Sequence, residues 1–258
     1  MGRIIAITNQ KGGVGKTTTA INLAATLAEA NQRILLLDFD PQGNATSGFG
    51  IEEDNIEHTI YDVMTEECSM DEAILVDVID NLDLLPSDMN LAAADVEFAE
   101  QEDKNLILKK LLKEYINRYD YILVDCPPSL GTITVNALTA ANSVIIPIQC
   151  EYYALEGLNQ VLNTIGIVQQ GLNPDLVIEG IVFTMYDSRN KLSQQVVETV
   201  RQNFQGSIYE TLIPRNVRLA EAPSHGLPIT LYESSSTGAD SYRKLAAEVM
   251  SKGDAIYG

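Results

Sequence analysis

Residues 9–19, NQKGGVGKTTT, decide the fold of this chain. They follow a short run rich in β-branched residues at 3–9, which predicts a buried strand. After them, Ala and Leu recur at helical spacing to about residue 30. Three glycines between a strand and a helix let backbone N–H groups point inward, and the helix N-terminus adds a partial positive charge. This context predicts a loop that binds phosphate.

The letters of the loop fit all but the first position of the pattern G-x-x-x-x-G-K-[ST], with Gly15, Lys16 and Thr17 at its end. Two features are unusual: the first letter is Gln10 instead of glycine, and a second lysine, Lys11, follows it directly. Lys16 is expected to contact the β- and γ-phosphates, and the Thr17 hydroxyl to ligate Mg²⁺. The nucleotide-binding loop is expected to comprise Lys11, Gly12, Gly13, Val14, Gly15, Lys16, Thr17 and Thr18.

Carboxylates follow two other apolar runs. ILVD ends at Asp125 before two prolines, and LLLDFD supplies Asp38 and Asp40 two residues apart. Nucleotide-bound Mg²⁺ usually takes a carboxylate from the end of another strand, a role that Asp125 fits. Asp40 is the candidate for orienting the attacking water and a further candidate near the metal, with Asp38 behind it. Either of the last two could instead be a turn residue.

Strand and helix signals alternate along the whole chain. This pattern predicts a single α/β domain over residues 1–258, with a mostly parallel, twisted sheet of about seven or eight strands covered by helices on both faces. Ligands bind at the carboxyl ends of the strands in such sheets. Strands are expected near 3–9, 33–40, 82–87, 119–125, 143–149, 176–184 and 208–214, and helices near 16–30, 106–116, 153–170, 191–204 and 240–252.

The net charge of −19 is concentrated in one part of the chain. Residues 52–103 contain 18 Asp and Glu and no Lys or Arg, whereas the remainder is close to neutral. Exposed charges more than about 10 Å apart are largely screened, so this acidic stretch, read as a solubilising face, does not exclude a DNA-binding patch elsewhere. Three widely spaced cysteines and the absence of an apolar leader favour a soluble cytoplasmic protein.

The loop KGGVGKTT resembles the deviant Walker A motif of the ParA/MinD ATPases, whose defining feature is the extra lysine, here Lys11. DFDPQGNAT and ILVDCPPSLG resemble further motifs of that family. VIIPIQCEYYALEGL and IPRNVRLAEAPSHGLPI resemble its chromosome-partitioning, Soj-type ParA branch. The resemblance covers nearly the whole chain and implies a P-loop NTPase fold and a slow ATPase with ATP and Mg²⁺ as cofactors.

The resemblance also implies how the site works. Two subunits bind ATP face to face, and Lys11 of each reaches phosphates held by the other, so that dimerisation depends on the triphosphate. Lys11, Lys16 and Asp40 are then the catalytic residues, and Thr17, Asp125 and Asp40 the metal-site residues. Met185, Pro214 and Asn216 are expected beside the adenine.

What this switch acts on is the question that remains open at this point. The partitioning branch implies sequence-independent binding to double-stranded DNA through Arg189 and Arg218, a ParB-type partner that stimulates hydrolysis, and a nucleoid location. The alternative is a MinD-like, membrane-associated ATPase, but the Ala-rich C-terminus makes a weak anchor, so no membrane partner is expected. A reductase with an iron–sulfur cluster would need Cys126 and Cys150 as ligands; a core role fits both better.

Overall fold

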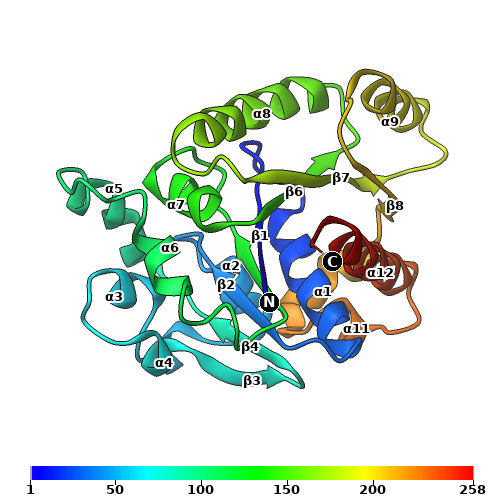
Figure 1. The fold of residues 1–258 in the computed structure, drawn as a ribbon. Coiled ribbons are helices and arrows are strands. Elements are labelled where there is room, and N and C mark those ends of the chain that lie inside the picture. Colours follow the sequence, from blue (N-terminus) through cyan, green and yellow to red (C-terminus); the bar gives the residue numbers. More distant parts are fainter. Residues whose placement is uncertain (1, 258) are drawn as a thin grey trace.

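Eight strands form one sheet in the order β3-β4-β2-β5-β1-β6-β7-β8 (Figure 1). The computed structural model describes residues 2–257. The strands are β1 (Arg3–Ile7), β2 (Ile34–Asp38), β3 (Leu75–Ile79), β4 (Leu82–Leu85), β5 (Tyr121–Asp125), β6 (Ser143–Gln149), β7 (Val177–Tyr186) and β8 (Ile208–Pro214). All pairings are parallel except that of β3 with β4. The predicted fold class and strand number are therefore confirmed.

The three central strands β1, β2 and β5 are buried along their whole length. Their near-continuous apolar sequences suit this position, because helices cover both faces of a parallel sheet. The register sets the site: Asp125 pairs with Ile7 of β1 on one side and with Asp38 of β2 on the other. The phosphate loop and two carboxylates thus meet at the carboxyl ends of the central strands.

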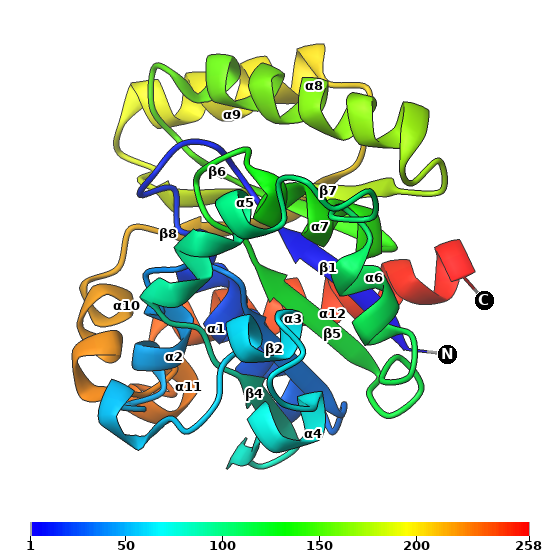
Figure 2. The same cartoon turned by 90° about the vertical axis from the view of Figure 1, so that its left-hand side faces the viewer.

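Each face of the sheet has its own apolar core. One face is covered by α1 (Lys16–Glu29), α2 (Asn44–Gly48), α10 (Val217–Glu221), η3 (Ala222–His225), α11 (Ile229–Tyr232) and α12 (Thr237–Tyr257). The other is covered by α3 (Ile60–Met64), α4 (Met70–Ala73), η2 (Met89–Ala93), α5 (Ala94–Glu97), α6 (Ile107–Leu112), α7 (Thr132–Ala140), α8 (Ala154–Gly171) and α9 (Lys191–Asn203). The two views in Figures 1 and 2 show this layering.

Some elements differ from the sequence-based expectation. The helix expected at 106–116 is shorter, Ile107–Leu112, and continues as turns. Helix α7 was not predicted, because its threonines lower helix propensity and its burial comes from tertiary packing. Strand β3 was also missed; it is a short edge strand whose Asp77 has a left-handed backbone.

The C-terminal helix packs against the core. Its apolar face, including Tyr242, Leu245 and Val249, is buried with α1 and β8. This packing agrees with an ordinary core helix as opposed to a membrane anchor, as far as its described side chains extend. Among the described residues, no helix combines the length and apolarity that crossing a bilayer requires.

Candidate nucleotide site

The loop between β1 and α1 has the geometry of an anion cradle. Gly13 and Gly15 have left-handed φ values of 73° and 87°, which side chains with a Cβ rarely adopt. Gly15 is the N-cap of α1 and supplies no side-chain acceptor. The first N–H groups of α1 are therefore left to bind an anion, with the helix dipole behind them.

Two polar side chains that the sequence analysis did not assign to the loop hold it in shape. The Thr184 hydroxyl, at the end of β7, donates to the Val14 carbonyl over 2.7 Å. Asn9 accepts from the Lys11 backbone N–H over 3.0 Å and donates to the Pro147 carbonyl over 2.7 Å. The loop is thus tied to β6 and β7, so its phosphate-binding shape is built before any ligand arrives.

Lys16 and Asp125 form the buried centre of the site. Burial lowers the pKa of Lys16, and the carboxylates of Asp125 and Asp40 oppose that shift. Asp125 is fully buried, and neither of its oxygens meets hydrogen-bond geometry with a donor in the described chain. Burial, and then repulsion from Asp38, raise its pKa well above the ordinary value; the nearby Thr17 hydroxyl and Lys16 ammonium only partly offset this.

Asp38 and Asp40 have different surroundings despite their proximity in sequence. Asp38 accepts hydrogen bonds from the backbone N–H and the hydroxyl of Thr46, both 2.8 Å long, yet burial raises its pKa to about 6. Asp40 accepts one bond from the Gln42 backbone N–H and lines the phosphate pocket. Asp38 thus lies behind the site, and Asp40 faces it.

These residues fit a magnesium ion. A fully buried carboxylate that has only a threonine hydroxyl beside it, and two further carboxylates nearby, is costly unless a cation joins it. No group of three or more His, Cys, Asp or Glu side chains surrounds a metal position in the described residues. Few protein ligands suit Mg²⁺, which keeps water molecules and takes nucleotide phosphates as further ligands.

The second lysine of the loop forms an ion pair within the same chain. The Lys11 ammonium lies 3.0 Å from the Glu151 carboxylate, and both side chains are partly exposed. Next to Glu151, Tyr152 and Tyr153 are 76% and 62% exposed and meet edge to face. Lys11 therefore points away from its own phosphate cradle, toward a surface with exposed aromatic side chains.

A second pocket, of about 320 Å³, opens beside the phosphate pocket. The predicted adenine neighbours Met185, Pro214 and Asn216 all line it, and Met185 has a left-handed φ of 51°. Gly15, Thr18 and Met185 line both pockets, so the two form one continuous site. The phosphate groups of a nucleotide would occupy the pocket at the loop, and its base would occupy the second pocket beside it.

The side chain of Asn216 already makes hydrogen bonds within the protein. Its side-chain oxygen accepts from the N–H groups of Arg218 and Leu219 and so caps α10. Its amide donates to the Thr237 hydroxyl over 2.8 Å. Only its second amide hydrogen is left for a base, so a role in base recognition stays a prediction.

The two predicted DNA-binding arginines lie in separate segments that follow the neighbouring strands β7 and β8. Arg189 follows β7 and is 89% exposed, while Arg218 lies in α10. Each pairs with a neighbouring acid: Arg189 binds both oxygens of Asp187 over 3.1 Å, and Arg218 lies 2.8 Å from Glu221. The structure does not bring the two arginines into contact in one chain.

Comparisons with known proteins agree with this geometry. A family model described as an AAA domain matches residues 2–178. The Bacillus subtilis protein "Sporulation initiation inhibitor protein Soj" is 54% identical over 253 residues, covering 98% of this chain and all of the relative. "Chromosome partitioning protein ParA" of Myxococcus xanthus is 53% identical over 252 residues, covering 98% and 89%. The chain belongs to the ParA/MinD family of ATPases.

Solved structures of other members share the fold of this ParA/MinD-family chain. Cobyrinic acid a,c-diamide synthase from Mycobacterium smegmatis, with bound ADP and magnesium, has a TM-score of 0.84 at 36% identity, with 96% of this chain and 93% of that chain covered. The cell division ATPase MinD of Pyrococcus furiosus has a TM-score of 0.79 at 28% identity, with 97% and 99% covered. Partitioning proteins, a biosynthetic enzyme and a cell division protein thus share one scaffold.

The sequence of this ParA/MinD-family protein located the loop and its carboxylates but missed their supports. Thr184 and Glu151 lie 170 and 140 residues from the loop atoms that they contact. A polar residue at the end of a predicted strand was the available signal for Thr184. For Glu151 the only signal was its place after a strand, beside two tyrosines.

Proposed function

We propose that this protein is an ATP-dependent DNA-segregation ATPase, whose Mg·ATP-bound dimer binds DNA without regard to sequence. Relatives that are named as partitioning proteins and about half identical over nearly the whole chain support the assignment. The observation that carries the ATPase part is the fully buried Asp125, next to the Thr17 hydroxyl and the Lys16 ammonium, beside a glycine loop whose helix has no side-chain cap. Its cofactors are ATP and Mg²⁺.

In this proposal the chain's own residues share the chemistry. The Lys16 ammonium and the N–H groups of the loop bind phosphate oxygens and neutralise charge that grows in the transition state. The Thr17 hydroxyl and Asp125 would hold the metal, which would supply charge neutralisation at the phosphates. Asp40, which lines the phosphate pocket, orients a water molecule with its carboxylate.

In this proposal, Lys11 makes dimerisation depend on the bound nucleotide. Held by Glu151, its ammonium lies on the surface of one subunit, near the exposed Tyr152 and Tyr153. In a face-to-face dimer it would bind phosphates of the other subunit, so the triphosphate favours the dimer and hydrolysis weakens it. Lys11→Ala is expected to abolish ATP-dependent dimerisation in light scattering. A normal ATP-dependent dimer with normal turnover would contradict this role.

The DNA part of the proposal rests on Arg189 and Arg218. Each is one exposed cation that contacts a backbone phosphate weakly, and a dimer doubles their number on one surface. Binding is therefore expected to be sensitive to salt and indifferent to sequence. Hydrolysis, stimulated by a ParB-type partner bound at a centromere site, would release the DNA, and the protein would act in the cytoplasm on the nucleoid.

The first experiment measures binding to a random-sequence duplex with no nucleotide, ADP, ATP or a slowly hydrolysed ATP analogue, at two salt concentrations. Arg189→Gln is compared with Arg33→Gln, which removes an exposed arginine at the opposite end of the strands. Binding only with the triphosphate is expected, and Arg189→Gln is expected to reduce the slope of log K against log salt by about 1 per subunit.

Anionic vesicles serve as the competing surface in the same experiment. Binding to vesicles and not to DNA would move the protein to a MinD-like, membrane-associated role. Equal losses in Arg189→Gln and Arg33→Gln would show that DNA binding does not depend on the predicted patch. DNA binding without any nucleotide would contradict the switch.

A further inference from the structure

A groove of about 790 Å³, which shares no residue with the nucleotide pockets, lies between α3–α4 and α5–α6. Its floor is apolar and firmly packed: Val63, Met64, Met70, Phe98 and Tyr115 are each at most 7% exposed. Ile107 and Leu111 add half-buried apolar surface. A groove of this size with an apolar floor suits a few side chains of a bound peptide.

The rim of the groove is acidic. Glu66, Glu97 and Glu114 are exposed along it, and the one lysine in the lining, Lys110, already pairs with Asp103. Among the described residues, no hydrogen-bond or ion-pair partner contacts the side chains of Glu66 and Glu114. The groove therefore offers unneutralised carboxylates around an apolar floor.

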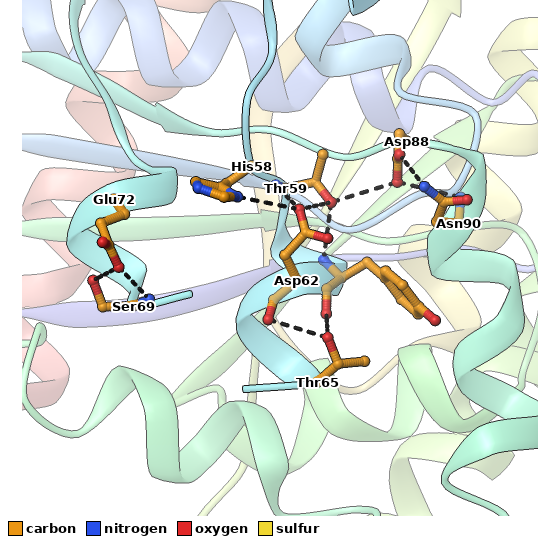
Figure 3. Close-up of polar contacts among 9 residues, drawn as sticks. His58, Thr59, Asp62, Thr65, Ser69, Glu72, Asp88 and Asn90 are labelled. Carbon is orange, nitrogen blue, oxygen red and sulfur yellow. Dashed lines mark hydrogen bonds and ion pairs between the residues drawn. The ribbon is translucent and has the colours of Figure 1, made fainter. Parts of the chain in front are cut away.

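One wall of the groove is fixed in advance by helix caps (Figure 3). The Thr59 hydroxyl caps α3, and Asp62 accepts from the Thr59 backbone N–H over 2.7 Å. In α4, Glu72 accepts from the N–H and hydroxyl of Ser69 over 2.8 and 2.7 Å. Because the caps already fix this wall, little conformational entropy is lost when a ligand binds, and this favours affinity.

Glu66 sits on this wall in a conformation that its side chain does not favour. It follows the end of α3 with a φ of 64°, the left-handed position that helices usually give to glycine. Glutamate lacks the short polar side chain that makes Asn and Asp tolerable there. A strained residue that exposes its charge at the mouth of a groove points to a binding role.

We propose that this groove docks a basic, amphipathic segment of a partner protein, with apolar side chains on the floor and Lys or Arg at the rim. The unpaired carboxylates favour cations, and they disfavour DNA and anionic lipid, both of which are negatively charged. The groove lies on the face of the sheet covered by α3 to α9, whereas Arg218 lies in α10 on the opposite face and Arg189 follows β7, away from the β3 and β4 edge. One subunit can therefore hold this partner and DNA at the same time.

The test uses a fluorescent model peptide of about 18 residues, built from leucine and lysine with the leucines on one helical face. One control peptide has the same composition with the leucines scattered, and another carries glutamate in place of lysine. Binding to the full chain is measured by anisotropy without nucleotide or DNA. Failure of the DNA-binding proposal would therefore leave this result unaffected, and the reverse also holds.

The groove variant is Glu66→Gln/Glu97→Gln/Glu114→Gln, which keeps the acceptor for the Tyr61 hydroxyl at position 97. Its matched control is Glu52→Gln/Glu53→Gln/Asp54→Asn, three exposed acids outside the groove. The groove variant is expected to weaken binding of the amphipathic peptide about tenfold, and the control variant less than twofold. Equal losses in both variants would mean diffuse attraction and would overturn the proposal.

Glu66→Gly separates binding from folding. It removes the carboxylate and also relieves the left-handed strain, so the melting temperature should stay the same or rise while peptide affinity falls about twofold or more. Unchanged affinity in this variant, or equal binding of the scattered-leucine peptide, would contradict the docking role.

Discussion

At the scale of single residues, the site depends on a few hydrogen bonds that cross the chain. Thr184 is the clearest case, because its hydroxyl is the contact that ties the tip of β7 to the phosphate loop at Val14. Both groups are buried, so the Val14 carbonyl would lose its partner without the hydroxyl. Leaving such an acceptor unsatisfied costs about 1–3 kcal/mol.

Thr184→Val is therefore expected to weaken ATP binding about five- to tenfold and to lower the melting temperature by a few degrees. Calorimetry of nucleotide binding and thermal unfolding measure the two effects. Thr184→Ser keeps the hydroxyl and should bind ATP nearly normally. Normal ATP binding in Thr184→Val together with weakened binding in Thr184→Ser would show that the methyl group, and not the hydrogen bond, matters.

Asp125 carries a second prediction at this scale. Because burial and Asp38 raise its pKa, its charge destabilises the protein without a cation. Asp125→Asn should then leave the nucleotide-free protein as stable as wild type, or more stable by about 1 kcal/mol. The same variant should lose the extra stabilisation that Mg²⁺ adds to ATP in thermal unfolding. Normal magnesium dependence in Asp125→Asn would remove this residue from the metal site.

Sequence reasoning reached these residues unequally. The loop and Asp125 follow from local patterns, since a strand, glycines and a lysine occupy adjacent positions. Thr184, Glu151 and the acidic groove do not, because each joins segments far apart in the chain. The sequence shows that Asp187 lies two residues from Arg189. It does not show whether this arginine pairs with the aspartate or is free to bind a phosphate.

At the scale of elements, the starts of β2 and β5 are tied together just outside the sheet. Asp120 accepts from the Arg33 backbone N–H over 2.8 Å and pairs with the Arg33 guanidinium at 3.1 Å. The hydrogen bonds from Arg33 lower the pKa of Asp120 below its ordinary value of 3.8. A carboxyl whose pKa is lower in the folded state stabilises the fold above the unfolded pKa.

Asp120→Asn is expected to lower the free energy of unfolding by about 1 kcal/mol at pH 7. The difference from wild type should shrink as the pH falls below about 3.8, because the wild-type carboxyl then takes up a proton and loses its advantage. Urea unfolding followed by circular dichroism over this pH range measures the effect. A difference that stays constant with pH would indicate that the ionised carboxylate plays no part.

The elements also show where the periodicity of the sequence locates an element well and where it does not. Strands β1, β2 and β5 are buried on both faces, so their apolar runs are long and continuous. The helix expected at 106–116 continues the right periodicity, but the chain leaves the helical conformation after Leu112. The periodicity of apolar residues predicts which side chains are buried. It does not predict where the helix ends, because local contacts determine that.

At the scale of the whole molecule, acids restrain the cations that the proposal assigns to DNA. Asp187 holds Arg189, and Glu221 holds Arg218 while also accepting from the Tyr232 hydroxyl. A phosphate must replace a carboxylate at each arginine before DNA is bound. These pairs should therefore keep DNA affinity low in a single subunit.

Asp187→Asn/Glu221→Gln is expected to raise the affinity for a random duplex about two- to fivefold per subunit. Anisotropy with the slowly hydrolysed ATP analogue measures it, and Glu210→Gln, which releases Arg201 in the same way, is the control. If the control gains as much affinity, the effect reflects total charge, and the local release of the predicted arginines is not supported.

The order of the strands has one more consequence. It puts β3 and β4, which belong to the acidic stretch, at one edge of the sheet and the near-neutral β7 and β8, with Arg189 after β7, at the other. Such a molecule has a permanent electric dipole along the width of its sheet. The electric field of a polyanion exerts a torque on this dipole. The molecule is therefore oriented as it approaches the polyanion, with the β7 and β8 edge toward it. The rate of productive encounters then depends on this alignment, and added salt slows capture before it weakens any contact.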